Sequence, residues 1–262
     1  MSNTVYNNKV VEAKAKDLLT TAVNTRNLMT IDDSLTETAG MVKTINTYTY
    51  TGTAETVTAG NGNSSRGSIG YVGNDYTVQM VQQAFDYTDE DFLKDNVIVD
   101  YGIKGATQVM ANKMTTDFIT ACNGATLTQT FAKGGNLDYD TIVDAISKLN
   151  LEDERDIFVV IPNTWKAALR KDEDYISARQ GEVVYTGQVG TICGIPVVAT
   201  KALTDKAYVM TKEAVKCFIK KDVEVEQDRD VDKRTNSIYL RDCYVVALVD
   251  GTKIAKITEA TA

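Results

Sequence analysis

The chain has 262 residues, of which 43% are apolar and 24% charged, a composition typical of a globular protein with a sizeable core. No run of about 18 apolar residues occurs, and the first residues interleave lysines with acids, so neither a membrane span nor a secretory signal is predicted and the expected compartment is the cytoplasm. Histidine is absent, which excludes Ser-His-Asp and Cys-His nucleophiles and imidazole metal sites, and the net charge of -8 argues against tight binding to nucleic acid phosphates.

The four cysteines, Cys122, Cys193, Cys217 and Cys243, lie far apart with no CxxC spacing. This pattern is typical of reduced thiols rather than of a disulfide framework or a zinc site. Cys193 and Cys217 stand in strand-like runs, so we expect buried, unreactive thiols there rather than nucleophiles.

The N-terminal third predicts an arm and a long hairpin. Residues 1–45 mix short helical signals with polar stretches and lack the apolar content for a core of their own, so we expect an arm that packs elsewhere. Residues 45–58 alternate with period 2, residues 59–70 supply Gly, Asn and Ser, and residues 71–85 resume as strand. These pieces predict an extended hairpin over residues 46–86. Its arms, about 40 Å long, would need a neighbouring subunit to cover them.

A long amphipathic helix follows the hairpin. The hydroxyl of Thr88, with Asp91 three positions on, predicts a capping box for a short helical turn. Over residues 96–123, apolar side chains then recur every three or four positions and form one stripe. Gly102 and Gly105 each disfavour the helix by about 1 kcal/mol relative to Ala, so we expect close packing or a kink there. The stripe consists of Val99, Ile103, Ala106, Met110, Met114, Phe118 and Ala121.

The rest of the chain predicts a mixed α/β unit and then mainly strands. A helix over residues 137–150, a buried strand over 156–161 and a helix that opens after Pro162 alternate, as in a layer of helices on a sheet. Trp165, at the start of that last helix, is expected to anchor packing. Six strand-like runs follow, separated by turn signals. They cover residues 189–200, 207–211, 214–219, 223–228, 236–250 and 252–257.

An acidic ladder stands out in the C-terminal third. In an extended strand its carboxylates, at every second position, would share one face and repel one another, while Val223, Val225 and Val231 would face the core. An EF-hand is excluded because Lys233 and Tyr239 stand where Gly and Glu are required. A solvated strand edge, salt bridges to a neighbouring subunit and a divalent ion shared between subunits remain open interpretations. The ladder comprises Asp222, Glu224, Glu226, Asp228, Asp230 and Asp232.

The Gly-rich segment at the hairpin tip invites comparison with a phosphate-binding loop. Gly62 and Gly67 have the Walker spacing, but Ser68 stands at the required lysine position and no strand-to-helix step surrounds it. A flexible hairpin tip needs the same residues without any ligand. Arg66, within this tip, joins the ladder as a candidate contact between subunits. Because no convergent acid–base pattern appears, no catalytic residue, metal or cofactor is assigned.

The order of arm, hairpin, long helix, central α/β unit and returning strands resembles the major capsid proteins of tailed bacteriophages. TDEDFLKDNVIVDYGIKGATQVMANKMTTDFITACNG is similar to the family's capped turn and spine helix, and FVVIPNTWKAALRK is similar to its strand-Pro-helix step. VGTICGIPVVAT and the strands after it are similar to the family's GxIxGIPV region. The likeness runs from Asp17 to Ile257 and rests on the order of the elements and on the residue patterns within them.

This resemblance implies an α+β fold with a peripheral domain at residues 87–124 and 221–262 and a central axial domain at residues 125–220. It implies a structural protein, not an enzyme, that assembles into hexamers and pentamers of an icosahedral head and encloses double-stranded DNA without binding it specifically. A scaffolding protein and a portal would be further partners, assembly would occur in the host cytoplasm, and no membrane would take part. Neither residue of the lysine–asparagine cross-link found in some members can be identified by motif.

Two other classes of function stay open at this point. The shell protein of an encapsulin-type bacterial compartment has the same fold and a similar length. A soluble carboxylate-dependent enzyme or metal-binding protein would rest on the acidic ladder alone. Particle size separates a shell from a small enzyme, and the enclosed cargo separates a phage head from a compartment.

Overall fold

The computed structural model describes residues 8–22, 28–37, 39–152, 156–174 and 190–260. Its helices are α1 (Asn8–Ala22), α2 (Asp89–Lys94), α3 (Ile98–Cys122), α4 (Tyr139–Leu149) and α5 (Lys166–Lys171), with short 3-10 turns η2 (Asn163–Trp165) and η3 (Gly251–Lys253). Its strands are β1 (Thr30–Asp32), β2 (Val42–Thr51), β3 (Ser68–Thr77), β4 (Gln79–Thr88), β5 (Leu127–Phe131), β6 (Ile157–Pro162), β7 (Thr191–Ile192), β8 (Ile195–Thr200), β9 (Lys206–Thr211), β10 (Val215–Asp230), β11 (Thr235–Leu248) and β12 (Ile254–Glu259).

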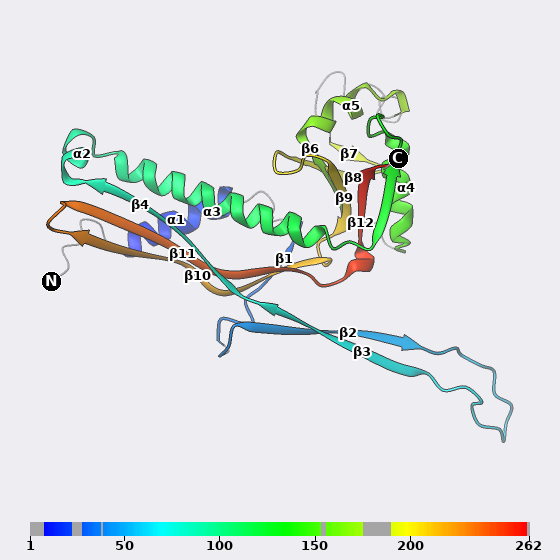
Figure 1. Ribbon diagram of the computed structural model, residues 1–262. Helices are drawn as coiled ribbons and strands as arrows, with labels where there is room; N and C mark the ends of the chain where they lie inside the picture. The colour runs from blue at the N-terminus through cyan, green and yellow to red at the C-terminus, as the bar shows by residue number, and fades with distance from the viewer. Residues whose placement is uncertain (1–7, 23–27, 38, 153–155, 175–189, 261–262) are drawn as a thin grey trace.

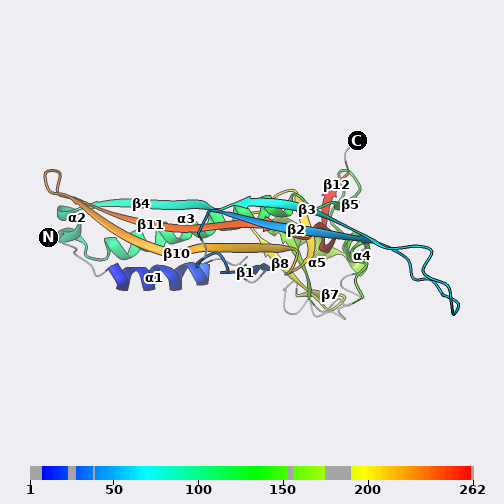
Figure 2. The ribbon, with the colours of Figure 1, turned by 90° about the horizontal axis from the view of Figure 1, so that it is seen from below.

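Three sheets organise these elements. A long four-stranded sheet of order β1-β10-β11-β4 carries α3 along one face, with α1 beside that helix (Figures 1 and 2). A six-stranded sheet of order β5-β12-β9-β6-β8-β7 stands at the C-terminal end of α3, with α4 packed against it. The two-stranded hairpin of β2 and β3 projects away from both bodies. The molecule is therefore elongated, with its core divided between the two larger sheets.

The expected spine helix is confirmed as α3, and its apolar stripe forms the centre of the larger core. Phe118 is only 1% exposed, and every other stripe residue except the half-buried Ala121 is buried as well. Thr88 caps the preceding turn by accepting a hydrogen bond from the Asp91 amide at 3.1 Å. A Cβ added at Gly102 would lie 2.2 Å from the Phe85 ring, so this glycine admits β4 close to the helix, whereas Gly105 has open space around it.

The strand expected over residues 71–85 is divided between two sheets. Residues up to Thr77 pair with β2, whereas Gln79 begins β4, which pairs with β11. Val78, between the two strands, is buried and donates its amide to the Met41 carbonyl at 2.7 Å. The side chains of β4 from Val81 to Tyr87 alternate toward α3, which gives this strand a core that the hairpin does not have.

The C-terminal strands also differ from expectation. The runs at 214–219 and 223–228 form one strand, β10, with irregular register between Ile219 and Glu224, because the bulged Lys-Asp segment bends the strand without ending it. β12 lies between β5 and β9 in the six-stranded sheet, although residues 221–262 were expected in the peripheral domain. The first residues of β10 lie in the long sheet, although 125–220 was expected in the axial domain. Strand pairing therefore groups β12 with the six-stranded sheet and the first residues of β10 with the long sheet.

The N-terminal helix is better anchored than an arm. Val11, Ala15 and Leu19 recur at helical spacing and are buried in the same core as α3, and the Lys14 ammonium contacts the Asp100 carboxylate of α3 at 2.6 Å. Residues 8–22 therefore pack on their own chain.

The cysteines confirm the expected chemistry in part. All four are free thiols, and Cys122, Cys217 and Cys243 are buried. The expected burial of Cys193 is wrong, because this residue turns with a φ of 50° in the tight connection between β7 and β8 and is exposed. Trp165 is a packing residue as expected, since its ring meets Phe131 edge-on with 5.3 Å between centroids.

Candidate functional site

The hairpin of β2 and β3 exposes one continuous apolar face. Tyr48 pairs directly with Tyr71, and Tyr50 with Ile69, so these four side chains lie on the same side of the two-stranded sheet. Each is exposed by about 70%, and the rings of Tyr48 and Tyr71 touch with 6.3 Å between centroids. No described element of the chain covers them. Large aromatic side chains left in water on an isolated ribbon are typical of a surface that becomes buried by another molecule.

The hairpin tip, residues 52–67, is closed by one carboxylate. Glu55 accepts hydrogen bonds from the Ser64 hydroxyl at 2.5 Å and from the amides of Ser64 and Ser65. The Ser64 hydroxyl and these amides hold the pKa of Glu55 below its usual value. Arg66, beside this closure, is exposed and forms no ion pair with any described residue. The Walker comparison fails here, since β3 rather than a helix follows Gly67.

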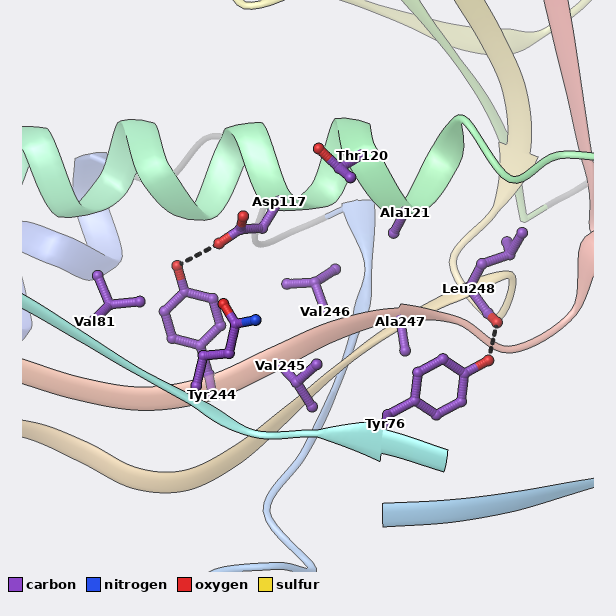
Figure 3. Close-up of a pocket in the computed structure, with 11 residues that line it drawn as sticks. Tyr76, Val81, Asp117, Thr120, Ala121, Tyr244, Val245, Val246, Ala247 and Leu248 are labelled. Atoms are coloured by element: carbon purple, nitrogen blue, oxygen red, sulfur yellow. Dashed lines mark hydrogen bonds between the residues drawn. The ribbon is translucent and has the colours of Figure 1, made fainter. Parts of the chain in front are cut away.

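The base of the hairpin is fixed to the long sheet beside an open cavity of about 490 Å³ (Figure 3). The Tyr76 hydroxyl donates to the Leu248 carbonyl at 2.7 Å. On the helix side of the same cavity, the Tyr244 hydroxyl donates to the Asp117 carboxylate at 3.0 Å, and burial raises the pKa of Tyr244. Lys43 packs its ammonium over the Phe218 ring, 5.7 Å from the centroid. These contacts set the direction in which the hairpin leaves the body.

Part of the acidic ladder is neutralised within the chain. Val223 and Val225 are buried, so the carboxylates between and beside them face the other side of β10 as expected. Basic side chains nevertheless form ion pairs with two of these carboxylates. Lys221 lies 2.7 Å from Glu224, and Arg241 of β11 lies 2.6 Å from Glu226. Asp222, next to the bulge, pairs with Lys16 of α1. These local ion pairs therefore relieve the expected repulsion at Asp222, Glu224 and Glu226.

The distal end of the ladder leaves the strand. β10 ends at Asp230, whose carboxylate accepts hydrogen bonds from the amides of Asp232 and Lys233, and these bonds lower its pKa. Asp232 lies in the following turn, so it does not continue the ladder. Val231, expected to face the core, is 76% exposed because it also belongs to this turn.

Strand pairing adds one carboxylate that the sequence pattern does not reveal. Asp228 of β10 and Asp86 of β4 both lie opposite Ser237 of β11, on the face of the sheet away from α3. Two strand spacings separate them by about 10 Å. No basic side chain among the described residues forms an ion pair with either one. Because Phe85 and Tyr87 are apolar and Asp86 stands between them, the sequence could have indicated that Asp86 faces outward. Its nearness to Asp228 depends on the register of β4, β11 and β10, which the sequence does not show.

Neither a cluster of metal ligands nor a membrane-spanning helix is found among the described residues. No group of three or more Cys, Asp or Glu residues in the described ranges is arranged to hold a metal ion. Within the same ranges, no helix combines the length and apolar character needed to cross a bilayer. The surface features described above are the aromatic face of the hairpin, the exposed Arg66 at its tip and the carboxylates on the outer face of the long sheet.

Comparison with known proteins identifies the family. The family model described as "Phage capsid protein" matches residues 71–257. The major capsid protein of Staphylococcus phage phiMR11 is 26% identical over 242 residues, which cover 88% of this chain and 85% of that protein. The capsid structure of cyanophage P-SCSP1u superposes with a TM-score of 0.72 at 12% identity, over 90% of this chain and 87% of that chain. The virus-like particle from Pyrococcus furiosus gives 0.66 at 10% identity, over 95% and 98%.

These likenesses confirm the α+β capsid fold expected from the order of the elements. The family model covers the second hairpin strand, the spine helix and both larger sheets, well over half of the chain. The relative from the Staphylococcus phage extends the agreement over most of both chains. The chain therefore belongs to the phage capsid protein family, as the major capsid protein of a phage.

Proposed function

We propose that copies of this chain join as hexamers and pentamers into the icosahedral head of a tailed bacteriophage. The single observation that carries the proposal is the projecting hairpin, whose aromatic face is exposed by about 70% at Tyr48, Tyr50, Ile69 and Tyr71. An apolar face exposed to water does not stabilise the subunit, whereas contact with a neighbouring copy would remove it from water and stabilise the assembly. The role is structural, and the net charge of -8 suits a container that encloses double-stranded DNA without gripping it.

The charges suggest how a hairpin and a neighbour fit together. Arg66 is exposed at the tip and forms no ion pair in the described chain. On the outer face of the long sheet, Asp86 and Asp228 are also exposed and form no ion pair with a described residue. We infer that Arg66 of one copy lies near these two carboxylates of another. Glu224 and Glu226, which already hold Lys221 and Arg241, contribute less to this contact. Electrostatic complementarity of this kind sets register and orientation more than affinity.

The size of the assembly tests the structural role. Sedimentation and electron microscopy of the purified chain should reveal capsomers or closed shells of very large mass. A monomer that persists over a wide range of concentration and salt would overturn the proposal.

A charge exchange tests the contact between hairpin and sheet. Replacing Arg66→Glu should lower the yield of shells, because the tip would then meet carboxylates. Combining it with Asp86→Arg and Asp228→Arg in the same chain should restore assembly, since the attraction is reversed in both partners. Lys133→Glu, an exposed change in another turn, is the matched control and should leave the yield unchanged. Equal yields from the first and the control variant would contradict the contact.

The further partners follow from the same proposal. We infer a scaffolding protein, a portal and packaged DNA, with assembly in the host cytoplasm. The likeness to the virus-like particle from Pyrococcus furiosus favours one alternative, a compartment shell that encloses protein. Nuclease-protected DNA in particles purified from infected cells supports the phage head, whereas particles that contain only protein support the compartment.

A further inference from the structure

Strand β4 forms an open edge of the long sheet. It is the last strand in the order β1-β10-β11-β4, and the described chain pairs it only with β11. Its register runs without a bulge from Gln79 to Thr88, opposite Tyr244 to Thr235. From Gln79 to Phe85 it contains no Lys, Arg, Pro or acidic residue. Natural edge strands are usually protected by such residues or by bulges, because an unprotected edge pairs with other chains.

The backbone and the side chains beside this edge are both available. The Ala84 carbonyl accepts a hydrogen bond from the adjacent Gln83 side-chain amide at 3.1 Å, a local bond that a donor of an added strand would replace. Next to the edge, a groove of about 350 Å³ runs between β4 and α3 and is lined in part by Met80, Val81 and Val109. Met80 is 62% exposed and Val109 51% exposed. A strand added to β4 would extend the sheet under this groove, and every second side chain of that strand would point into it.

We propose that this edge accepts β2 of a second copy as a fifth strand of the sheet. The inference rests on the proposed shell, and names the backbone contact through which one copy holds another. The copy's own hairpin cannot supply the strand, because β3 joins β4 through the single residue Val78 and projects away from the sheet (Figures 1 and 2).

Three features select β2 as the occupant. β2 and β4 each have ten residues, so their edges match in length. The outer edge of β2 is itself open, since β2 pairs only with β3 in the described chain. β2 alternates Thr with Tyr48 and Tyr50, which would fill the apolar groove, whereas β3 contains Gly70 and Gly73, which weaken a strand and offer no side chain. Backbone pairing with alternate side chains in pockets is the general mode of strand addition.

A lysine placed on the edge tests the pairing against docking on the sheet face. Ala84 of β4 lies directly opposite Tyr239 of β11, and both face away from α3. Ala84→Lys at the edge should lower the yield of shells roughly tenfold or more, as charged edge residues oppose strand addition. Tyr239→Lys has the same charge on the same face but lies on a strand already paired on both sides. It should therefore lower the yield much less than Ala84→Lys, and only through its nearness to the proposed Arg66 contact.

The two variants separate this inference from the proposed shell. An equal loss of shells in the two variants would indicate that the neighbour is held through the face alone, which overturns strand addition and retains the shell. Normal yields in both variants would also overturn strand addition. Melting of the dissociated subunits checks that each variant folds.

Hydrogen exchange and cross-linking test the pairing in the unmodified edge and identify the occupant. Amides of residues 79–88 should exchange at least about tenfold more slowly in shells than in dissociated subunits, since added backbone hydrogen bonds protect them. Equal exchange would contradict strand addition.

A mixture of Ala84→Cys chains with Thr49→Cys chains should give a disulfide-linked dimer on assembly. A dimer formed as readily by Ala84→Cys alone would instead indicate pairing between two β4 edges and overturn the assignment to β2.

Discussion

The hairpin and the spine helix are neighbours in sequence, but the helix buries its apolar stripe and the hairpin exposes its apolar face. α3 buries Phe118 and the other residues of its stripe against β11, β4 and α1 of the same chain. β2 and β3 hold Tyr48 and Tyr71 in register with each other, but nothing described lies against that face. The helix therefore contributes to the stability of the subunit, whereas under the proposed function the hairpin contributes to the assembly. A change in one region should leave the property of the other region intact.

Shortening the hairpin is the strongest way to break this comparison. Replacing residues 46–73 by a short Gly-Ser linker keeps Ile45, Tyr76 and Val78, which anchor the hairpin base. Because the removed face has no partner in its own chain, the melting temperature of the subunit should change by less than about 4 °C, which corresponds to about 1 kcal/mol or less. Shells should be absent in electron micrographs. Shells at normal yield would assign the assembly contact to another part of the molecule.

Truncating one aromatic residue in each region sharpens the contrast. Phe118→Ala should destabilise the subunit by about 3–5 kcal/mol, because it leaves a cavity at the centre of the larger core. Tyr48→Ala should change the free energy of unfolding by less than about 0.5 kcal/mol, as is usual for exposed positions, while it lowers the yield of shells. Chemical denaturation of dissociated subunits, together with the yield of particles, measures both effects. A large loss of subunit stability in Tyr48→Ala would contradict the division.

The two glycines of α3 provide a finer test within the helix. Gly102→Ala should destabilise by about 1–3 kcal/mol, because the new methyl group would overlap the Phe85 ring of β4. Gly105→Ala meets no atom within 4 Å and should stabilise the helix by about 0.5–1 kcal/mol. Denaturant midpoints of the dissociated subunits measure the difference. Effects of equal sign would mean that β4 does not approach the helix at Gly102.

Acidification should give the smallest effect, at the distal turn of the long sheet. The Asn236 amide and Arg229, each 2.8 Å from an Asp89 carboxylate oxygen, lower the pKa of Asp89. Charged Asp89 therefore stabilises the fold at pH values above about 3.9, which is the pKa of Asp in the unfolded chain. This stabilisation is lost as the pH falls through the lower pKa of the folded state. The hydrogen-exchange protection of α2, corrected for the intrinsic exchange rate at each pH, should therefore fall below about pH 4. Asp89→Asn should weaken that dependence, while Asp91 and Asp230, whose pKa values are also lowered, maintain the remainder.

The sequence by itself determined the elements whose signals are local. The 3.6-residue stripe from Val99 to Phe118 is long enough to specify α3, and Thr88 caps the turn before it through contacts three residues away. The alternation around Tyr48 and Tyr71 predicted the hairpin, and the length of its arms predicted that a neighbouring subunit covers it. The family resemblance followed from the order of these elements, because order along the chain is what a sequence records.

Tertiary structure alone decided which strands lie side by side. The sequence did not indicate that β12 inserts between β5 and β9, because pairing over such separations depends on which surfaces remain to be buried. The sequence left a solvated edge, salt bridges to a neighbouring subunit and a shared divalent ion open for the ladder, whereas the register brings Arg241 to Glu226 and the helix brings Lys16 to Asp222 within the same chain. Among the described residues, the same register leaves Asp86 and Asp228 without a basic partner and leaves the edge of β4 unpaired. Cross-strand neighbours are fixed by packing of the whole sheet, so the assembly surfaces could be located only after the strands were paired.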